Sequence, residues 1–228
     1  MFKKVKLLET LPGSDHVKTF RFERPEGFSF LPGQFVMISC AAVKTPADIP
    51  LKRALSIASD PEAPFLEFCI ALGTPQGLSH HLFFNAKNGD EFSLEGPQGN
   101  FTFSPSKNER IFIAGGTGIG PLRSMLFTLA KDDIPTTLFY GFRTPKEFLY
   151  KEEFEQYPNL RVIPAVSDYN KNDWQGEKGW ISDILQKYIK DGQGKDVYLC
   201  GPSPMVEAAM GKLRELHFPE ENIHREQW

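Results

Sequence analysis

The chain has 228 residues, of which 40% are hydrophobic and 24% charged, and a formal net charge of −3 at pH 7. This length allows one large domain or two small ones. Neither half of the chain is strongly basic, which argues against nucleic-acid binding. The three scattered cysteines, Cys40, Cys69 and Cys200, argue against a disulfide framework, a metal site or an iron–sulfur cluster. Any redox cofactor should therefore be organic.

No apolar run has the length of a membrane span, and the N-terminal sequence lacks a signal-peptide core. We therefore expect a cytoplasmic protein without a membrane span. The neighbouring histidines His80 and His81 have no carboxylate or cysteine companion nearby in the sequence, so we expect them to pack or to face solvent and to bind no metal.

The first half of the chain reads as short β-strands separated by Gly, Pro and Asp. The expected strands cover residues 18–23, 34–40, 54–59, 65–72 and 91–94. Many short strands of this kind favour a small antiparallel β-barrel. Most of the 20 phenylalanines also lie here, so we expect bulky aromatic side chains to fill the barrel interior.

In the second half, strands alternate with amphipathic helices. Strands are expected at residues 111–114, 137–141, 160–166, 197–200 and 222–227. Helices are expected from residue 122, after a Thr144 cap with Pro145 and Glu147, over residues 181–189, and from Ser203 to residue 216. This alternation is typical of a doubly wound parallel α/β sheet. We therefore expect two domains, residues 1–105 and residues 106–228.

A glycine turn follows the first strand of this second half. The apolar strand ends in the sequence Gly115-Gly116-Thr117-Gly118-Ile119-Gly120-Pro121, and apolar residues then recur at helical spacing. A helix start presents unpaired backbone N–H groups, and glycines let a phosphate approach them closely. Alone, the turn is equally compatible with a structural role, because Pro121 takes the place of the third glycine of the dinucleotide fingerprint.

Three further strand ends carry marked residues. Arg143 follows the second strand, Ser167 and Asp168 follow the third, and Cys200 leads into Gly201-Pro202 after the fourth. Ligands of open parallel sheets bind beyond the carboxyl ends of the strands. Four such ends together predict a nucleotide site more strongly than the glycine turn alone.

The whole chain resembles the ferredoxin–NADP reductase family, in a form without an iron–sulfur domain. The resemblance lies in the segments Arg53-Ala54-Leu55-Ser56, Gly77-Leu78-Ser79, Gly96-Pro97-Gln98-Gly99, the glycine turn 115–121, Tyr140-Gly141-Phe142-Arg143 and Cys200-Gly201-Pro202-Ser203-Pro204-Met205. It implies an N-terminal β-barrel that binds FAD and a C-terminal α/β domain that binds a nicotinamide nucleotide.

For the flavin, the resemblance implies that Arg53 binds the pyrophosphate and that Ser56 donates a hydrogen bond near flavin N5. Ala54 and Leu55 belong to the same motif, and Gly77, Leu78 and Ser79 supply a second phosphate contact. Leu55 departs from the family, which often has a tyrosine there. Leucine can cover the flavin ring but cannot stack on it or donate to it.

For the nucleotide, the resemblance implies a binding site made of Gly116, Thr117, Gly118, Pro121, Arg143, Ser167, Asp168, Cys200, Gly201, Pro202 and Met205. The implied catalytic residues are Ser56, Cys200 and Glu226, and the terminal Trp228 lies over the flavin in some members. We expect NADH rather than NADPH, because the charge of Asp168 would repel a 2′-phosphate and can bind ribose hydroxyls.

The leading hypothesis is an FAD-dependent NAD(P)H reductase that passes electrons to a ferredoxin, a flavodoxin, a cytochrome or an oxygenase component. A second hypothesis is a reductase of free, dissociable flavin, which Leu55 would fit. A third is a non-catalytic nucleotide-binding subunit of a redox complex. Flavin retention and NADH oxidation separate the three.

Overall fold

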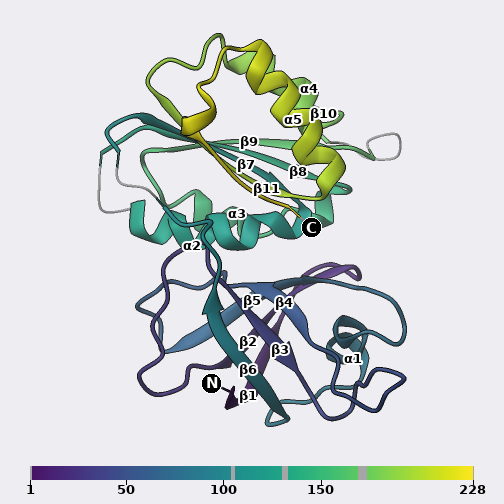
Figure 1. The fold of residues 1–228 in the computed structure, drawn as a ribbon. Helices are drawn as coiled ribbons and strands as arrows, with labels where there is room; N and C mark the ends of the chain where they lie inside the picture. Colours follow the sequence, from purple (N-terminus) through teal and green to yellow (C-terminus); the bar gives the residue numbers. More distant parts are fainter. Residues whose placement is uncertain (1, 104–105, 130–132, 169–173, 228) are drawn as a thin grey trace. The chain divides into compact units, whose positions relative to one another are not determined.

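The computed structural model describes residues 2–103, 106–129, 133–168 and 174–227 (Figure 1). The chain divides into two compact units. Unit 1 contains Met1–Phe103 together with Arg123–Phe127, and unit 2 contains Ser104–Leu122 and Thr128–Trp228. The expected boundary at residue 105 lies outside the described residues.

Unit 1 is built on a six-stranded antiparallel sheet. Its strands are β1 (Phe2–Leu11), β2 (Val17–Glu23), β3 (Phe35–Ser39), β4 (Arg53–Ser56), β5 (Phe65–Ala71) and β6 (Glu91–Gln98), in the order β4-β3-β6-β1-β2-β5. Every pairing is antiparallel, as the sequence predicted. The strand β1, which the expected strand set omitted, lies between β6 and β2 and ties the N-terminal segment into the sheet.

Phenylalanines fill the interior of unit 1. Phe22 packs edge-on against Phe68 and Phe92, with ring centroids 5.6 and 5.2 Å apart. All three rings are buried, although they come from three different strands, β2, β5 and β6. The helix α1 (Leu78–Phe84) adds the buried Leu78 and Leu82 to the same core.

Unit 2 contains a parallel sheet whose strand order reverses once. Its strands are β7 (Glu109–Gly115), β8 (Thr136–Phe142), β9 (Leu160–Val166), β10 (Glu177–Lys178), β11 (Lys195–Gly201) and β12 (Ile223–Gln227), in the order β10-β9-β8-β7-β11-β12. The chain adds β8, β9 and β10 on one side of β7 and then returns to place β11 on the other. The carboxyl ends of β7 and β11 therefore flank the switch point where such folds bind ligands.

Helices lie on both faces of this sheet. The helices α4 (Ile181–Tyr188) and α5 (Ser203–Glu215) cover one face, and the short α3 (Lys151–Phe154) lies on the other (Figure 1). The helix α2 (Ile119–Leu129) follows the 3₁₀ turn Gly116–Gly118, and a further 3₁₀ turn at Glu220–Asn222 precedes β12. Within the described ranges, no helix is long and apolar enough to cross a membrane.

The helix expected after Thr144 is only a 3₁₀ turn, Pro145–Glu147, followed by the four-residue α3. Tyr150 adopts a left-handed conformation with φ of 60°, which separates the two segments. The Glu147 carboxylate still reaches back, accepting from the Arg143 amide at 3.3 Å and from the Thr144 hydroxyl at 3.5 Å. The predicted capping pair thus closes a tight turn and does not start a long helix.

Candidate functional site

Three glycines bring the turns after β7 and β11 into direct backbone contact. A Cβ atom on Gly118 would lie 2.1 Å from the carbonyl oxygen of Cys200. A Cβ on Gly201 would lie 3.1 Å from the Cα of Gly115, and one on Gly115 would lie 2.4 Å from the sulfur of Met205. Real Cβ atoms do not come within 2.1 Å of a carbonyl oxygen, so Gly118 is required where its turn packs against the backbone of β11. The contact of Gly201 with Gly115 is tighter than usual, and the neighbour of Gly115 is the flexible end of the Met205 side chain.

Gly116, in contrast, has open space where a side chain would lie. Its φ is +52°, and a Cβ placed there would meet no atom within 4 Å. This open side lies on the turn that runs into α2, where the first backbone N–H groups of a helix have no intrahelical partner. Thr117 is half-buried beside it and Pro121 is buried. The turn therefore offers an accessible, side-chain-free backbone of the kind that fits a nucleotide diphosphate.

The ends of β8 and β9 bring Arg143, Ser167 and Asp168 together. The Asp168 amide donates to the Arg143 carbonyl at 2.9 Å, and the Ser167 amide donates to the Phe142 carbonyl at 3.0 Å. The Ser167 hydroxyl donates to the same Phe142 carbonyl at 3.4 Å. Arg143 and Asp168 are both exposed, so a cationic and an anionic side chain flank this part of the carboxyl edge.

Lys178 and Trp180, which the sequence analysis did not single out, extend this edge. The strand β10 pairs Lys178 with Val166 of β9, and the Gly179 amide donates to the Val166 carbonyl at 2.9 Å. Trp180 follows directly and is 67% exposed. In the sequence, the tryptophan after Gly179 could have drawn attention to this segment. The two-residue strand before it has no periodicity that would have placed it at the edge of the sheet.

Cys200 and Glu226 face each other across neighbouring parallel strands. They are register partners on β11 and β12, and the Cys200 Sγ lies 4.0 Å from the Glu226 Oε2. Burial, and to a smaller extent the Glu226 charge, raises the pKa of the Cys200 thiol well above its usual value. The thiol is therefore protonated at neutral pH, which suits a small weak donor rather than a nucleophile.

The predicted flavin motif lies on β4, an end strand of the unit 1 sheet. Arg53 and Ala54 are exposed, whereas Leu55 and Ser56 are half-buried. The strand pairs with β3, with Leu55 opposite Val36 and Ser56 opposite Phe35. Leu55 packs partly against the core of unit 1. The exposed guanidinium of Arg53 is accessible to an anionic ligand.

The second predicted flavin segment forms a tight turn into α1. Gly77 is the N-cap residue, and its amide donates to the Thr74 carbonyl at 2.8 Å. Leu78 is buried and Ser79 half-buried. A Cβ on Gly73 would lie 2.5 Å from the Ser79 hydroxyl oxygen, so the turn passes close over this side chain.

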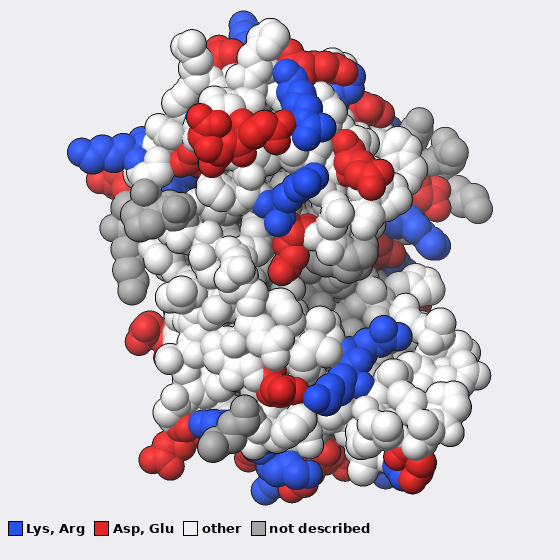
Figure 2. Space-filling model, viewed as in Figure 1, with Lys and Arg blue, Asp and Glu red and all other residues white. Residues whose placement is uncertain are grey.

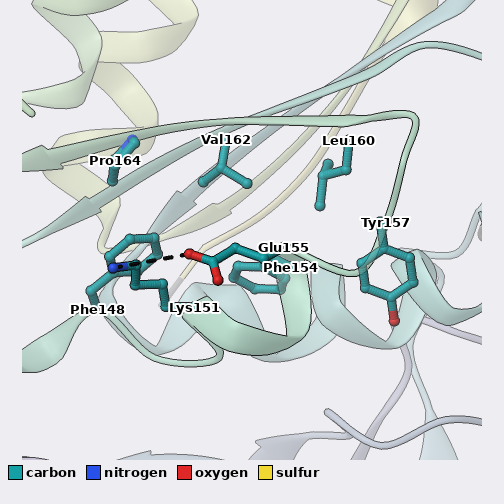
Figure 3. A pocket seen from close by; sticks show the side chains of 8 residues that line it. All are labelled: Phe148, Lys151, Phe154, Glu155, Tyr157, Leu160, Val162 and Pro164. Carbon is teal, nitrogen blue, oxygen red and sulfur yellow. Dashed lines mark ion pairs between the residues drawn. The ribbon is translucent and has the colours of Figure 1, made fainter.

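A separate cavity of about 310 Å³ lies on unit 2 beside α3 and β9 (Figure 3). Aromatic and aliphatic side chains line it together with the ion pair of Lys151 and Glu155, whose nitrogen and oxygen lie 4.0 Å apart. None of the predicted site residues lines it. In the described part of the chain, no three His, Cys, Asp or Glu side chains are arranged to hold a metal ion.

The predicted site residues thus form two sets. The flavin set lies on β4 and at the start of α1 in unit 1, and the nucleotide set lies along the carboxyl edge of the sheet in unit 2. Gly201, Pro202 and Met205 stand at the start of α5 beside the glycine turn. Trp228 lies outside the described residues.

Two protein-family models match separate segments of the chain. The model of the oxidoreductase FAD-binding domain matches residues 4–103, and that of the oxidoreductase NAD-binding domain matches residues 112–210. Together the two matches span most of the chain.

Among curated proteins, a component of the Na⁺-translocating NADH-quinone reductase of Idiomarina loihiensis is 32% identical over 229 residues, which cover 91% of this chain and 55% of that protein. The phenol hydroxylase P5 protein of Acinetobacter pittii is 30% identical over 225 residues, covering 94% of this chain and 62% of that protein. The chain therefore spans little more than half the length of these curated relatives.

Among solved structures, the ferredoxin reductase in carbazole 1,9a-dioxygenase superposes with a TM-score of 0.88. It is 27% identical, and the match covers 100% of this chain and 69% of that one. Both domain families, the curated relatives and the superposition agree with the two-domain fold. The chain belongs to the ferredoxin–NADP reductase-like family of FAD- and NAD-binding oxidoreductases.

Proposed function

We propose that this protein is an NAD(P)H reductase that takes a hydride from the nicotinamide nucleotide, NADH in preference, and passes electrons to a one-electron acceptor. Residues 1–105 would bind FAD and residues 106–228 the nucleotide. The observation that carries the proposal is the glycine-packed switch point, where Gly118 lies against the Cys200 carbonyl. A turn with glycine at both ends thus packs against the end of the strand that carries the buried Cys200 thiol.

The nucleotide would bind with its diphosphate on the turn Gly116–Gly118, where the open side of Gly116 leaves the backbone accessible. The protonated Cys200 thiol would contact the nicotinamide ring, and the Glu226 carboxylate would hold or accept a proton beside it. This pair suits hydride transfer because a neutral sulfur fills space against the ring without placing a negative charge on it. Trp180 would stack on the adenine.

The flavin would be held by Arg53, whose exposed guanidinium gives two parallel donors to a pyrophosphate. Ser56 would direct its hydroxyl to the reacting flavin nitrogen, Leu55 would cover the ring, and Gly77 and Ser79 would make the second phosphate contact. When bound, FAD supplies the conversion of a two-electron hydride into single electrons. The protein's part is to bind, to orient and to keep water out.

The preference for NADH is proposed on Asp168, whose exposed carboxylate would accept hydrogen bonds from ribose hydroxyls and repel a 2′-phosphate. Arg143 and Lys178 lie at neighbouring strand ends, and their positive charges favour NADPH. We give Asp168 the greater weight because it directly follows Ser167, at the position where NADPH-dependent members of the family have a basic residue.

The proposed acceptor is a separate redox protein, such as a ferredoxin, a flavodoxin, a cytochrome or an oxygenase component. The names of the relatives support this range, since they include a reductase in a dioxygenase and a phenol hydroxylase protein. Acidic and basic side chains are interspersed over the face shown in Figure 2.

A second candidate function, reduction of free flavin that binds and leaves, is favoured by one observation. Leu55 packs partly against the core of unit 1 and offers no ring to stack on a flavin. Such an enzyme would lose its flavin during purification. A non-catalytic nucleotide-binding subunit would bind nucleotide without oxidising it.

Anaerobic stopped-flow absorbance of the purified, unsupplemented protein, mixed separately with NADH and NADPH, tests the proposal. Fast bleaching of a resident flavin by NADH is the expected result. A colourless preparation that oxidises NADH only after flavin is added would identify the flavin reductase instead. If neither nucleotide is oxidised, with or without added flavin, the protein is not a reductase and the non-catalytic role remains.

A further inference from the structure

A buried carboxylate in unit 1 joins two arginines that lie far apart in the sequence. Glu67 on β5 is 2% exposed. Its Oε1 accepts from the Nε and Nη2 of Arg21 at 3.1 and 2.8 Å, and its Oε2 accepts from the Nη1 of Arg123 at 2.6 Å. Both carboxylate oxygens are thus occupied by guanidinium donors inside the protein.

The two arginines differ in what else they contact. Arg21 of β2 is partly exposed, and its Nη1 donates to the surface residue Glu9 at 2.9 Å. Arg123 is buried, and its Nη1 also donates to the Ala58 carbonyl at 2.9 Å. The next residue, Ser124, donates its hydroxyl to the Ser59 carbonyl at 2.9 Å. The Arg123 end of the network therefore fixes a backbone segment within unit 1.

That segment is part of α2, the helix that starts at the nucleotide turn. α2 covers Ile119–Leu129 and directly follows Gly116–Gly118. Arg123 is four residues, about one helical turn, beyond Ile119. Because a helix transmits position along its axis, holding Arg123 restricts the first turn of α2. Removing one partner of a buried ion pair leaves an uncompensated charge, so this geometry is strongly held.

We propose that Glu67 is a positioning residue for the nucleotide turn: through Arg123 it fixes α2 and so keeps the backbone of Gly116–Gly118 in its binding conformation. The inference rests on the proposed function in assigning the turn to the nucleotide diphosphate. Among the described residues, the carboxylate of Glu67 is hydrogen-bonded to Arg21 and Arg123. Its loss should weaken nucleotide binding and loosen the start of α2, and leave flavin binding at Arg53 unchanged.

The test compares Glu67→Gln with the matched control Glu9→Gln. The control removes the exposed carboxylate that binds Arg21. The first readout is hydrogen exchange of the cofactor-free protein, comparing peptides that cover residues 116–129 with peptides from β3. The second is calorimetric affinity for NAD⁺, and the third is flavin content after gel filtration. Arg123→Lys keeps the positive charge and reduces the number of hydrogen-bond donors. If Glu67→Gln does not fold, Arg123→Lys takes its place in the test.

In Glu67→Gln, we expect exchange over residues 116–129 to become about tenfold faster and the Kd for NAD⁺ to rise about tenfold, with β3 protection and flavin content unchanged. Arg123→Lys should give a smaller change in the same direction, and Glu9→Gln none. Equal loss of protection in β3 and α2, or unchanged exchange over 116–129, would overturn the proposal. If wild-type protein binds neither NAD⁺ nor NADP⁺, the proposed function fails, whereas the exchange result still decides whether Glu67 holds α2.

Discussion

The Cys200 thiol and the Glu226 carboxylate are register partners on adjacent parallel strands, with the Sγ 4.0 Å from the Oε2. Cys200 ends an apolar strand and is fully buried, whereas Glu226 lies on β12 at the edge of the sheet and is half-buried. The pair therefore combines a desolvated acid with a fixed negative charge. Both features disfavour the thiolate, and both raise the thiol pKa.

This raised pKa predicts a pH dependence of stability. The thiol of the unfolded chain loses its proton near pH 8.5, whereas the folded thiol keeps it to higher pH. Above pH 8.5 the unfolded state therefore binds fewer protons, and the contribution of Cys200 to the free energy of unfolding should fall by up to about 1.4 kcal/mol per pH unit. Below pH 8.5 that contribution should be constant.

Denaturant unfolding of wild type and Cys200→Ala from pH 7 to pH 10 measures this contribution as the difference between the two proteins. The volume lost in the alanine variant gives a constant offset, so only the change with pH carries the prediction. In a Glu226→Gln background the fall should end at a lower pH, because burial alone then raises the pKa. A difference that stays constant to pH 10 would contradict a raised thiol pKa.

The glycine turn predicts that two neighbouring alanine substitutions have unequal costs. Gly118→Ala would place a methyl group 2.1 Å from the Cys200 carbonyl oxygen, which forces the two turns apart. We expect a loss of about 3 kcal/mol in the free energy of unfolding and loss of NAD⁺ binding. Gly116→Ala meets no atom and should cost only about 1 kcal/mol for its left-handed backbone.

Urea unfolding of both variants, with NAD⁺ binding by calorimetry, measures these costs. Gly116→Ala is the internal control, because it adds the same methyl group two residues away. Equal destabilisation of the two variants would show that the turns after β7 and β11 are not packed as described.

The sequence predicted most of this architecture because periodicity is a local signal. The helix α4 was predicted because Ile181, Ile184 and Leu185 recur at helical spacing, and those side chains are buried. Short elements escape this signal. The strand β10 has two residues, and α3 has four after the left-handed Tyr150, so neither is long enough for its side-chain pattern to repeat.

The network around Glu67 was invisible in the sequence for a different reason. Its strand, Phe65–Ala71, is apolar apart from Glu67, and a single glutamate in such a strand does not indicate which residues would pair with it. The partners that permit its burial are 46 and 56 residues away, in β2 and α2. Long-range pairing of this kind leaves no local pattern. By contrast, Cys200 and Glu226 were singled out from the family resemblance, and their pairing across β11 and β12 is a structural finding.

Arg53 offers a test of the flavin assignment. Because its side chain is exposed on β4, Arg53→Ala should leave the melting temperature of the flavin-free protein unchanged. Loss of a bidentate contact to a pyrophosphate should weaken FAD binding by about 10-fold to 100-fold. Titration of the flavin-free protein with FAD, followed by fluorescence, measures the Kd.

Lys52→Ala is the matched control for that experiment. Lys52 precedes Arg53, but its ammonium donates to Glu95 at 2.9 Å, so removing it should change FAD affinity little. An Arg53→Ala variant that binds FAD as tightly as wild type would rule out the pyrophosphate contact.

Asp168 predicts the direction of a change in nucleotide choice. In Asp168→Arg, a guanidinium would stand at the end of β9, next to Arg143, whose carbonyl accepts from the amide of residue 168 at 2.9 Å. The cationic edge should attract a 2′-phosphate and lose the ribose hydrogen bonds, so the ratio of kcat/KM for NADPH over NADH should rise at least about tenfold. Steady-state kinetics with a one-electron dye measure this ratio.

Asp168→Asn separates the two causes of that change, because it removes the repulsion and adds no cation. Its ratio should therefore lie between those of wild type and Asp168→Arg. If all three proteins share one ratio, the end of β9 does not read the ribose. Lys178 on β10, which pairs with the last residue of β9, then becomes the residue to substitute next.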